Sequence, residues 1–180
     1  IPLRLVGSEM CIRDRFIKDA IFNEICTTLD LPEEELSQFS ADVLDRFRNP
    51  YLEHALMSIS LNSTSKYKTR VLPSVLEYIK RKNKNPEYLL FSLAALIAFY
   101  KGERGEESFS VKDDQSALDF FATQWAKGDT ESVVKATLKN TDLWGTDLTQ
   151  FEGLEETVTN NFCHSYTSDA ADEGLGVDLG

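Results

Sequence analysis

The strongest constraint on the fold is an apolar run at residues 89–100, LLFSLAALIAFY. It is too short to cross a lipid bilayer, which needs about 20 apolar residues, and it includes Ser92. Pro86 precedes the run and Gly102 follows it, and these residue types commonly stand at the start and just beyond the end of a helix. The run therefore predicts a buried central helix between Pro86 and Gly102.

Two helices are expected before this run. Phe16, Ala20 and the isoleucines at positions 17, 21 and 25 mark the buried side of a first amphipathic helix. Pro32, followed by three glutamates, predicts the start of a second helix, because proline fits the first turn and carboxylates favour the positive end of the helix dipole. The second helix should end at the Asn-Pro pair at 49–50 and bury five apolar side chains: Leu36, Phe39, Val43, Leu44 and Phe47.

Most of the remaining sequence also has helical patterns. The expected segments are, in order, a helix at about 73–82, a turn at 83–85, a charged loop at 102–114 with a short extended piece at 108–111, short helices at 115–125 and 130–138, and a last helix at 153–161. Thr130 is a suitable N-cap for the second of the short helices. The predicted fold class is all-α, a domain of many helices.

Length and charge limit the domain count and the classes of partner. With 180 residues, of which 42% are hydrophobic, the chain can form one well-packed core, and its length indicates a single domain. Its net charge of −11 argues against nucleic acid or an anionic membrane as the main partner, because both require a basic surface.

Cysteine and histidine usage indicates neither a disulfide framework nor a metal site. Cys11, Cys26 and Cys163 have no CxxC spacing, which fits a reducing cytoplasm. The histidines are His54 and His164, and the latter lies near the C-terminal end. We therefore expect a cytoplasmic protein without a metal centre.

One stretch, residues 49–73, gathers polar side chains between apolar anchors. His54 and Ser58 lie one turn apart on the helix expected at its start. A polar run at 62–65, Asn-Ser-Thr-Ser, then interrupts the apolar pattern and predicts a break in the helix. Its hydroxyl and amide groups can form hydrogen bonds with an oxygen-rich ligand.

Three cations follow this polar run. Lys66, Lys68 and Arg70 repel one another unless solvent or an anion screens their charges. We therefore predict a pocket here for a polyhydroxylated anion. A second basic cluster at 80–84 has a different explanation, because cations at the end of a helix complement its dipole and are usually solvated.

Four segments of the sequence resemble a known family. They are LDLPEEEL at 29–36, RFRNPYLEHALMSISLNSTSKYKTRVLPSVLEYI at 46–79, LLFSLAALIAFYKGER at 89–104 and WGTDLTQFEGL at 144–154. Together they resemble the C-terminal domain of the tagaturonate reductases (altronate oxidoreductases), a branch of the mannitol dehydrogenase family. The resemblance covers roughly residues 16–160.

The resemblance implies a helical domain that closes over a sugar-acid substrate, next to an N-terminal Rossmann domain that binds NAD. In this family, a Lys-x4-Asn-x2-His motif that opens the C-terminal half supplies the catalytic residues. The motif is not found in this sequence. The resemblance thus implies a fragment of an oxidoreductase of hexuronate catabolism, with the catalytic and cofactor-binding residues in the part that precedes it.

The resemblance also implies substrate-binding residues. In the wider family, a Leu-Asp-Gly-Ser-x-Lys segment supplies a substrate-binding lysine, and Lys66 of LNSTSK occupies that place here. Ser58 stands where that family has a substrate-contacting arginine, so Lys68 or Arg70 is expected to pair with a substrate carboxylate. The further candidates are Asn62, Ser65 and His54. Each also has a purely structural explanation: Asn62 and Ser65 as caps of the helix break, and His54 as a helix histidine.

The two ends of the chain differ from this family. Residues 1–15 resemble the translation of a sequencing-adapter read-through, and the alternative is a short native strand and turn. From residue 162 the sequence loses periodicity and gathers Gly and Asp. The predicted organisation is a non-native segment at 1–15, a helical domain at 16–161 and an irregular or disordered tail at 162–180.

Two other functions fit the sequence less well. A mannitol or fructuronate oxidoreductase is the nearest alternative, but a neutral polyol would not need the three cations at 66–70. A non-catalytic helical interaction module would also fit an acidic domain with a basic rim. A glycine-rich dinucleotide fingerprint and the Lys-x4-Asn-x2-His motif in the same reading frame would favour the enzyme.

Overall fold

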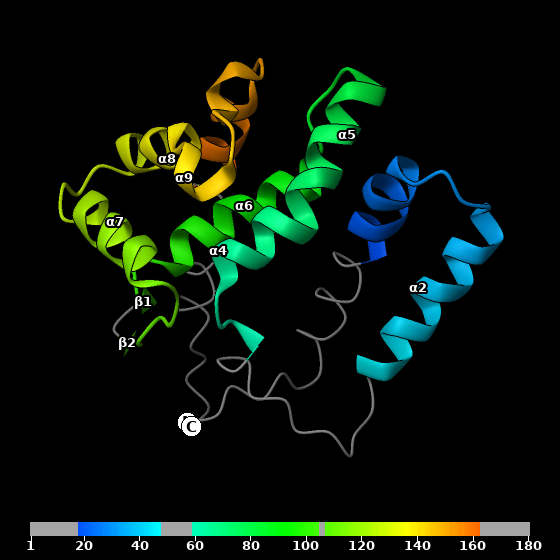
Figure 1. Cartoon of the computed structure of the whole chain (residues 1–180), viewed down its shortest axis with the longest axis horizontal. Coiled ribbons are helices and arrows are strands. Elements are labelled where there is room, and N and C mark those ends of the chain that lie inside the picture. Colours follow the sequence, from blue (N-terminus) through cyan, green and yellow to red (C-terminus); the bar gives the residue numbers. More distant parts are fainter. Residues whose placement is uncertain (1–17, 48–58, 105–106, 163–180) are drawn as a thin grey trace, which may run out of the picture.

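The computed structural model describes residues 18–47, 59–104 and 107–162 (Figure 1). In these ranges the chain is mainly helical, which confirms the all-α fold class. The helical elements are η1 (Ala20–Ile25), η2 (Cys26–Thr28), α2 (Glu33–Phe47), α4 (Ser63–Lys66), η3 (Tyr67–Val71), α5 (Leu72–Lys82), α6 (Glu87–Phe99), α7 (Gln115–Trp125), α8 (Thr130–Lys139), α9 (Thr141–Trp144), η4 (Leu148–Gln150) and a helix at 154–162. The short strands β1 (Glu103–Arg104) and β2 (Glu107–Ser108) pair as an antiparallel hairpin.

Helix α6 forms the centre of the core and confirms the buried helix predicted between Pro86 and Gly102. Residues of η3, α5, α7, α8 and the helix at 154–162 belong to the same apolar cluster. Four side chains of α6 have no exposed surface: Leu90, Leu93, Ala94 and Ile97. Burial of each of the larger ones contributes about 1.5–3 kcal/mol to the free energy of unfolding. No helix in the described ranges is long and apolar enough to span a membrane.

The chain is helical without interruption from Ser63 to Lys82, through α4, η3 and α5 (Figure 1). Residues 60–62 form a turn with Asn62 in a left-handed conformation, so the predicted break exists but ends before Ser63 instead of covering 62–65. The predicted start near Pro73 is wrong, because the helix already begins at Ser63. The N–H of Leu72 bonds to the carbonyl of Tyr67, five residues earlier, so the helix widens into a π turn directly before the proline. This wider turn lets the helix continue past a residue that has no N–H to donate.

The first described elements only partly match the predicted burial. Ala20 is buried and Leu36 is nearly so, but Phe39 is 67% exposed, which contradicts its predicted place in the core. Val43 and Leu44 are half-buried, and the side chain of Phe47 lies outside the described part of the structure. Helix α2 lies at one edge of the molecule in Figure 1. An apolar period identifies one side of a helix, but burial also requires neighbouring elements that cover the whole of that side.

A buried glutamate links η1 to the start of α6. The N–H groups of Tyr88 and Leu89 donate to Oε1 and Oε2 of Glu24 at 2.9 and 2.7 Å. Pro86, the N-cap residue of α6, has no side-chain acceptor, so Glu24 supplies the cap from a distant part of the chain. Burial raises the pKa of Glu24, and the N–H groups offset part of that rise.

We expect Glu24→Ala to lower the free energy of unfolding by about 1–3 kcal/mol, because two N–H groups at the start of α6 would lose their acceptors. Urea unfolding of the chain, followed by circular dichroism, measures the change. Glu87→Ala is the matched control, since Glu87 is an exposed carboxylate in the first turn of the same helix. Equal losses in the two variants would contradict a specific capping role for Glu24.

The loop after α6 contains the hairpin, at a different place from the extended piece predicted at 108–111. Glu103 pairs with Ser108 and Arg104 pairs with Glu107. The second strand is Glu107–Ser108, and the N–H of Phe109 also donates to the carbonyl of Gly102 at 2.9 Å, so the predicted piece overlaps the strand only at its end. The prediction was therefore wrong about which residues are extended.

The helices of the second half lie where the sequence predicted them. Helix α7 and the helix at 154–162 agree with their predicted ranges to within a residue. Helix α8 begins at Thr130, but its N-cap is Asp129, whose carboxylate accepts a 3.2 Å hydrogen bond from the N–H of Ser132. The prediction of Thr130 as the cap was wrong by one position, because a carboxylate stands immediately before it.

The basic cluster at 80–84 is the exposed end of α5, as predicted. One of its members also has a tertiary role. Arg81 donates to both carboxylate oxygens of Asp30 at 2.7 and 3.0 Å, and to Glu77 at 2.7 Å. The end of α5 is thereby tied to the segment between η2 and α2.

Candidate functional site

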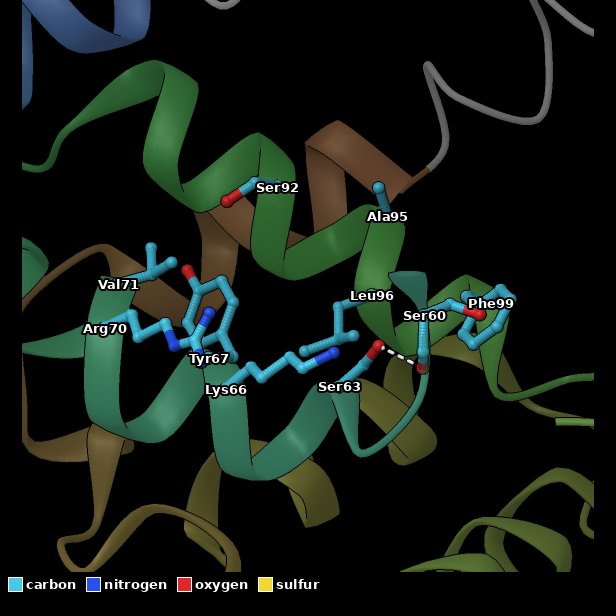
Figure 2. Close-up of a pocket in the computed structure, with 10 residues that line it drawn as sticks. All are labelled: Ser60, Ser63, Lys66, Tyr67, Arg70, Val71, Ser92, Ala95, Leu96 and Phe99. Carbon is cyan, nitrogen blue, oxygen red and sulfur yellow. Dashed lines mark hydrogen bonds between the residues drawn. The ribbon is translucent and has the colours of Figure 1, made fainter. Parts of the chain in front are cut away.

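A pocket of about 400 Å³ lies between the helix that starts at Ser63 and helix α6 (Figure 2). One wall is formed by Ser60, Ser63, Lys66, Tyr67, Arg70 and Val71. The opposite wall comes from α6 and is formed by Ser92, Ala95, Leu96 and Phe99. The pocket thus has a polar wall with two cations and a largely apolar wall with one hydroxyl.

Lys66 lies in the middle of the polar wall, between Ser63 and Arg70 (Figure 2). Figure 2 shows its side chain extended toward Ser63. Its Nζ donates to the carbonyl of Ile59 at 2.8 Å, and the side chain is half-buried. An ammonium group has three N–H donors, so Lys66 keeps donors for a ligand after this bond.

Arg70 lies one helical turn further along, beside Val71 in Figure 2. Its side chain is exposed, and within the described ranges this side chain makes no hydrogen bond or ion pair. The two cations face the same pocket because residues four positions apart lie on one side of a helix.

The structure does not bring the other proposed ligands to the pocket lining. The Nζ of Lys68 donates to the carbonyl of Asp142 at 3.1 Å, at the start of α9. Asn62 and Ser65 are exposed, and Asn62 precedes α4 in a left-handed conformation without a side-chain cap bond. His54 lies outside the described residues. A role in substrate binding for these four residues stays a prediction.

Tyr67 fixes the polar wall against the core. Its hydroxyl donates to the carbonyl of Leu89 at 2.8 Å, and its ring packs edge-on against Trp144 with the centroids 5.8 Å apart. Burial raises the pKa of Tyr67 far above its ordinary value. The hydroxyl therefore stays protonated at neutral pH and acts as a structural donor rather than as a base.

Asp113 fixes the start of the same helix from the loop that follows the hairpin. Its Oδ2 accepts from the N–H and Oγ1 of Thr64 at 3.0 and 2.9 Å, and also from the hydroxyl of Tyr100. The N–H of Asn62 donates to the carbonyl of Lys112 at 3.1 Å. These bonds hold α4, and with it Lys66, against the end of α6.

Several pocket residues were not among the candidates chosen from the sequence. Ser63 belongs to the polar run at 62–65 and Ser60 stands just before it, and the hydroxyl of Ser63 donates to the carbonyl of Ser60 at 2.7 Å (Figure 2). Ser92 had a usable signal, because it is the hydroxyl in an otherwise apolar run. Phe99 had none, since an aromatic residue at the end of a buried helix is ordinary core sequence.

The pocket offers groups suited to binding an anion. Its lining has no aspartate, glutamate, histidine or cysteine, and its possible acid-base groups are Lys66 and Tyr67, of which Tyr67 already donates to a backbone carbonyl. The two cations can donate to the oxygens of an anionic ligand, and the hydroxyls of Ser63 and Ser92, which already donate to the carbonyls of Ser60 and Leu89, can accept from its hydroxyl groups. The apolar wall can contact the carbon skeleton of such a ligand.

Known proteins with similar sequences share one name. Altronate oxidoreductase from Enterobacter sp. (strain 638) is 47% identical over 157 residues, which are 84% of this chain and 32% of that protein. The protein of the same name from Klebsiella pneumoniae is 45% identical over 157 residues, with the same coverage. That from Escherichia coli O139:H28 is 43% identical over 159 residues, 86% of this chain and 32% of that protein.

The chain therefore spans about a third of the length of these relatives. A family model, mannitol dehydrogenase C-terminal domain, matches residues 10–166. The match begins inside the segment at 1–15, which lies outside the described residues, so the artefact interpretation and the domain boundaries stay predictions. Because the family model covers most of its residues, this chain belongs to the mannitol dehydrogenase C-terminal domain family.

Proposed function

We propose that this chain is the substrate-binding C-terminal part of an NAD-dependent tagaturonate reductase, which interconverts altronate and tagaturonate in hexuronate breakdown. The relatives that share 43–47% of the aligned residues are named altronate oxidoreductases. The observation that carries the proposal is the pocket wall on which Lys66 and Arg70 stand one turn apart among serine hydroxyls. A sugar acid offers the matching groups, a carboxylate and a row of hydroxyls.

We assign the cofactor and the reacting groups to the rest of the full-length protein. The sheet in the described ranges is a two-stranded hairpin, which offers no parallel strand followed by a glycine-rich turn for the pyrophosphate of NAD. When bound, NAD supplies the hydride that the interconversion requires. The residues of this chain would hold and orient the sugar acid and exclude water along the apolar wall.

The decisive test is an exchange enzyme, in which this chain replaces the matched third of the Enterobacter relative. With NADH, we expect kcat/KM for tagaturonate to exceed the values for fructuronate and fructose by at least about tenfold, the factor that about 1.4 kcal/mol of differential binding provides. A preference for fructuronate or fructose would assign the chain to another oxidoreductase of the family. A folded exchange enzyme that binds NADH but reduces none of the three would overturn the proposal.

The chain by itself should be catalytically silent. We expect no oxidation of NADH above the buffer rate when the 180-residue chain is incubated with NADH and tagaturonate. The physical reason is that its described part lacks a dinucleotide-binding turn and that the family's Lys-x4-Asn-x2-His motif is not found in its sequence. Loss of NADH absorbance identifies any turnover, and the exchange enzyme is the positive control. Turnover by the purified chain would show that this assignment of the chemistry is wrong.

A further inference from the structure

We propose that Arg70 is the group that recognises the substrate carboxylate and makes the site selective for sugar acids over neutral sugars. The inference rests on the proposed function, which supplies a substrate with a carboxylate. It deepens that function because it distinguishes between cations that the sequence left equivalent.

The hydrogen bonds of the three cations separate their roles. Lys68 is turned away from the pocket and donates to the carbonyl of Asp142 at 3.1 Å. Lys66 lines the pocket, but its ammonium group donates one N–H to the carbonyl of Ile59 at 2.8 Å. Arg70 lines the pocket and, in the part of the chain that the structure describes, pairs with no acceptor. Among the three, it is the one that lines the pocket and has none of its side-chain donors engaged within the described residues.

The chemistry of the side chain also favours Arg70. A guanidinium group is planar and presents paired N–H donors whose spacing matches the two oxygens of a carboxylate. No aspartate or glutamate lines the pocket, so no lining carboxylate competes for these donors.

The positions of the two pocket cations suit an elongated ligand with one charged end. Figure 2 shows the Lys66 ammonium directed toward Ser63 and the Arg70 guanidinium beside Tyr67, so the two charged groups lie apart along the polar wall. Side chains four residues apart on a helix have Cβ atoms about 5–6 Å apart, so the two cations contact different parts of a six-carbon chain. Arg70 would bind the terminal carboxylate, while Lys66 and the serines bind hydroxyl or carbonyl oxygens.

The test compares an acid with its neutral counterpart in the exchange enzyme. Tagatose has a hydroxymethyl group where tagaturonate has its carboxylate, and it is used as a competitive inhibitor. We expect Arg70→Gln to raise the KM for tagaturonate about tenfold and to leave the inhibition constant of tagatose unchanged. Tenfold is the lower end of the range for a charge-assisted hydrogen bond, and it applies here because Arg70 is exposed. Arg70→Lys should give an intermediate KM, since it keeps the charge but loses the paired donors.

Lys80→Gln, at the exposed end of α5, is the matched control, and the KM for NADH reports whether each variant is folded. An unchanged KM for tagaturonate in Arg70→Gln would overturn the inference, as would equal losses of affinity for the two sugars. A loss specific for the acid in Lys68→Gln, with Arg70→Gln neutral, would transfer the role to Lys68 and also overturn it. Failure of the unmodified exchange enzyme to reduce tagaturonate would be a failure of the proposed function itself.

Discussion

Lys66→Ala in the exchange enzyme is expected to raise the KM for tagaturonate by about ten- to a hundredfold and to leave the KM for NADH unchanged. A charge-assisted hydrogen bond contributes roughly 1.5–3 kcal/mol, which corresponds to that range of affinities. Lys66 lines the pocket, is half-buried, and is held in place by its hydrogen bond to the carbonyl of Ile59, so its remaining donors are available to a ligand. Initial-rate measurements with each substrate varied separately give both constants.

The contrast between the two substrates separates lost binding from damage to the fold, because unfolding would weaken both. Lys80→Ala is the control, since its side chain is 77% exposed and it pairs only weakly, at 3.4 Å, with Glu77. If Lys66→Ala leaves the KM for tagaturonate unchanged while Lys68→Ala or Arg70→Ala raises it strongly, the family lysine was aligned a few residues away from its true position. Neutral results at all three cations would refute an anion site in this pocket.

Asp113→Ala is expected to lower the free energy of unfolding of the chain by about 2–4 kcal/mol. One carboxylate oxygen accepts from both donors of Thr64 and from the hydroxyl of Tyr100. Truncation removes this acceptor from all three donors and leaves the Thr64 N–H only its longer bond, 3.2 Å, to the Tyr100 hydroxyl. Urea unfolding followed by circular dichroism measures the loss. Asp114→Ala is the matched control, because Asp114 is exposed and makes no side-chain cap bond to α7.

The same variant should also change the response to acid. Burial raises the pKa of Asp113, but the hydrogen bonds from Tyr100, Thr64 and Asp114 outweigh burial and hold the pKa below its usual range. The stabilisation is therefore complete above the unfolded-state pKa of about 3.9 and is lost as the pH falls through the lower folded-state value. The difference in stability between wild type and Asp113→Ala should shrink at about pH 3 compared with neutral pH. A difference that is independent of pH would contradict a charged role for Asp113.

The sequence alone determined the central helix and the composition of the site. Helix α6 is apolar on nearly all sides, so any compact arrangement of this chain must bury it, whatever its neighbours are. The 66–70 segment was identifiable because three cations close together in an acidic chain require solvent or an anion. Both features depend on residues that are adjacent in the chain.

Only the tertiary structure decided which cation faces the pocket. Successive residues of a helix point about 100° apart, so Lys66 and Arg70 share a side, while Lys68 points away from them toward α9. That conclusion required the helix to be continuous through 63–82, and the local pattern of polar residues and Pro73 had suggested a break. The π turn before Pro73 allows the helix to continue past this residue, and no local pattern in the sequence indicated such a turn.

The caps of the two helices that form the pocket were likewise invisible in the sequence. Glu24 caps α6 from 65 residues away, and Asp113 caps α4 from 49 residues away. Local capping motifs place the acceptor within a few residues of the N–H groups that it satisfies, so a pattern search finds caps such as Asp129 but not these. A long-range cap depends on where folding brings a distant carboxylate, and that is set by the packing of η1 and the 112–114 loop on α6 and α4.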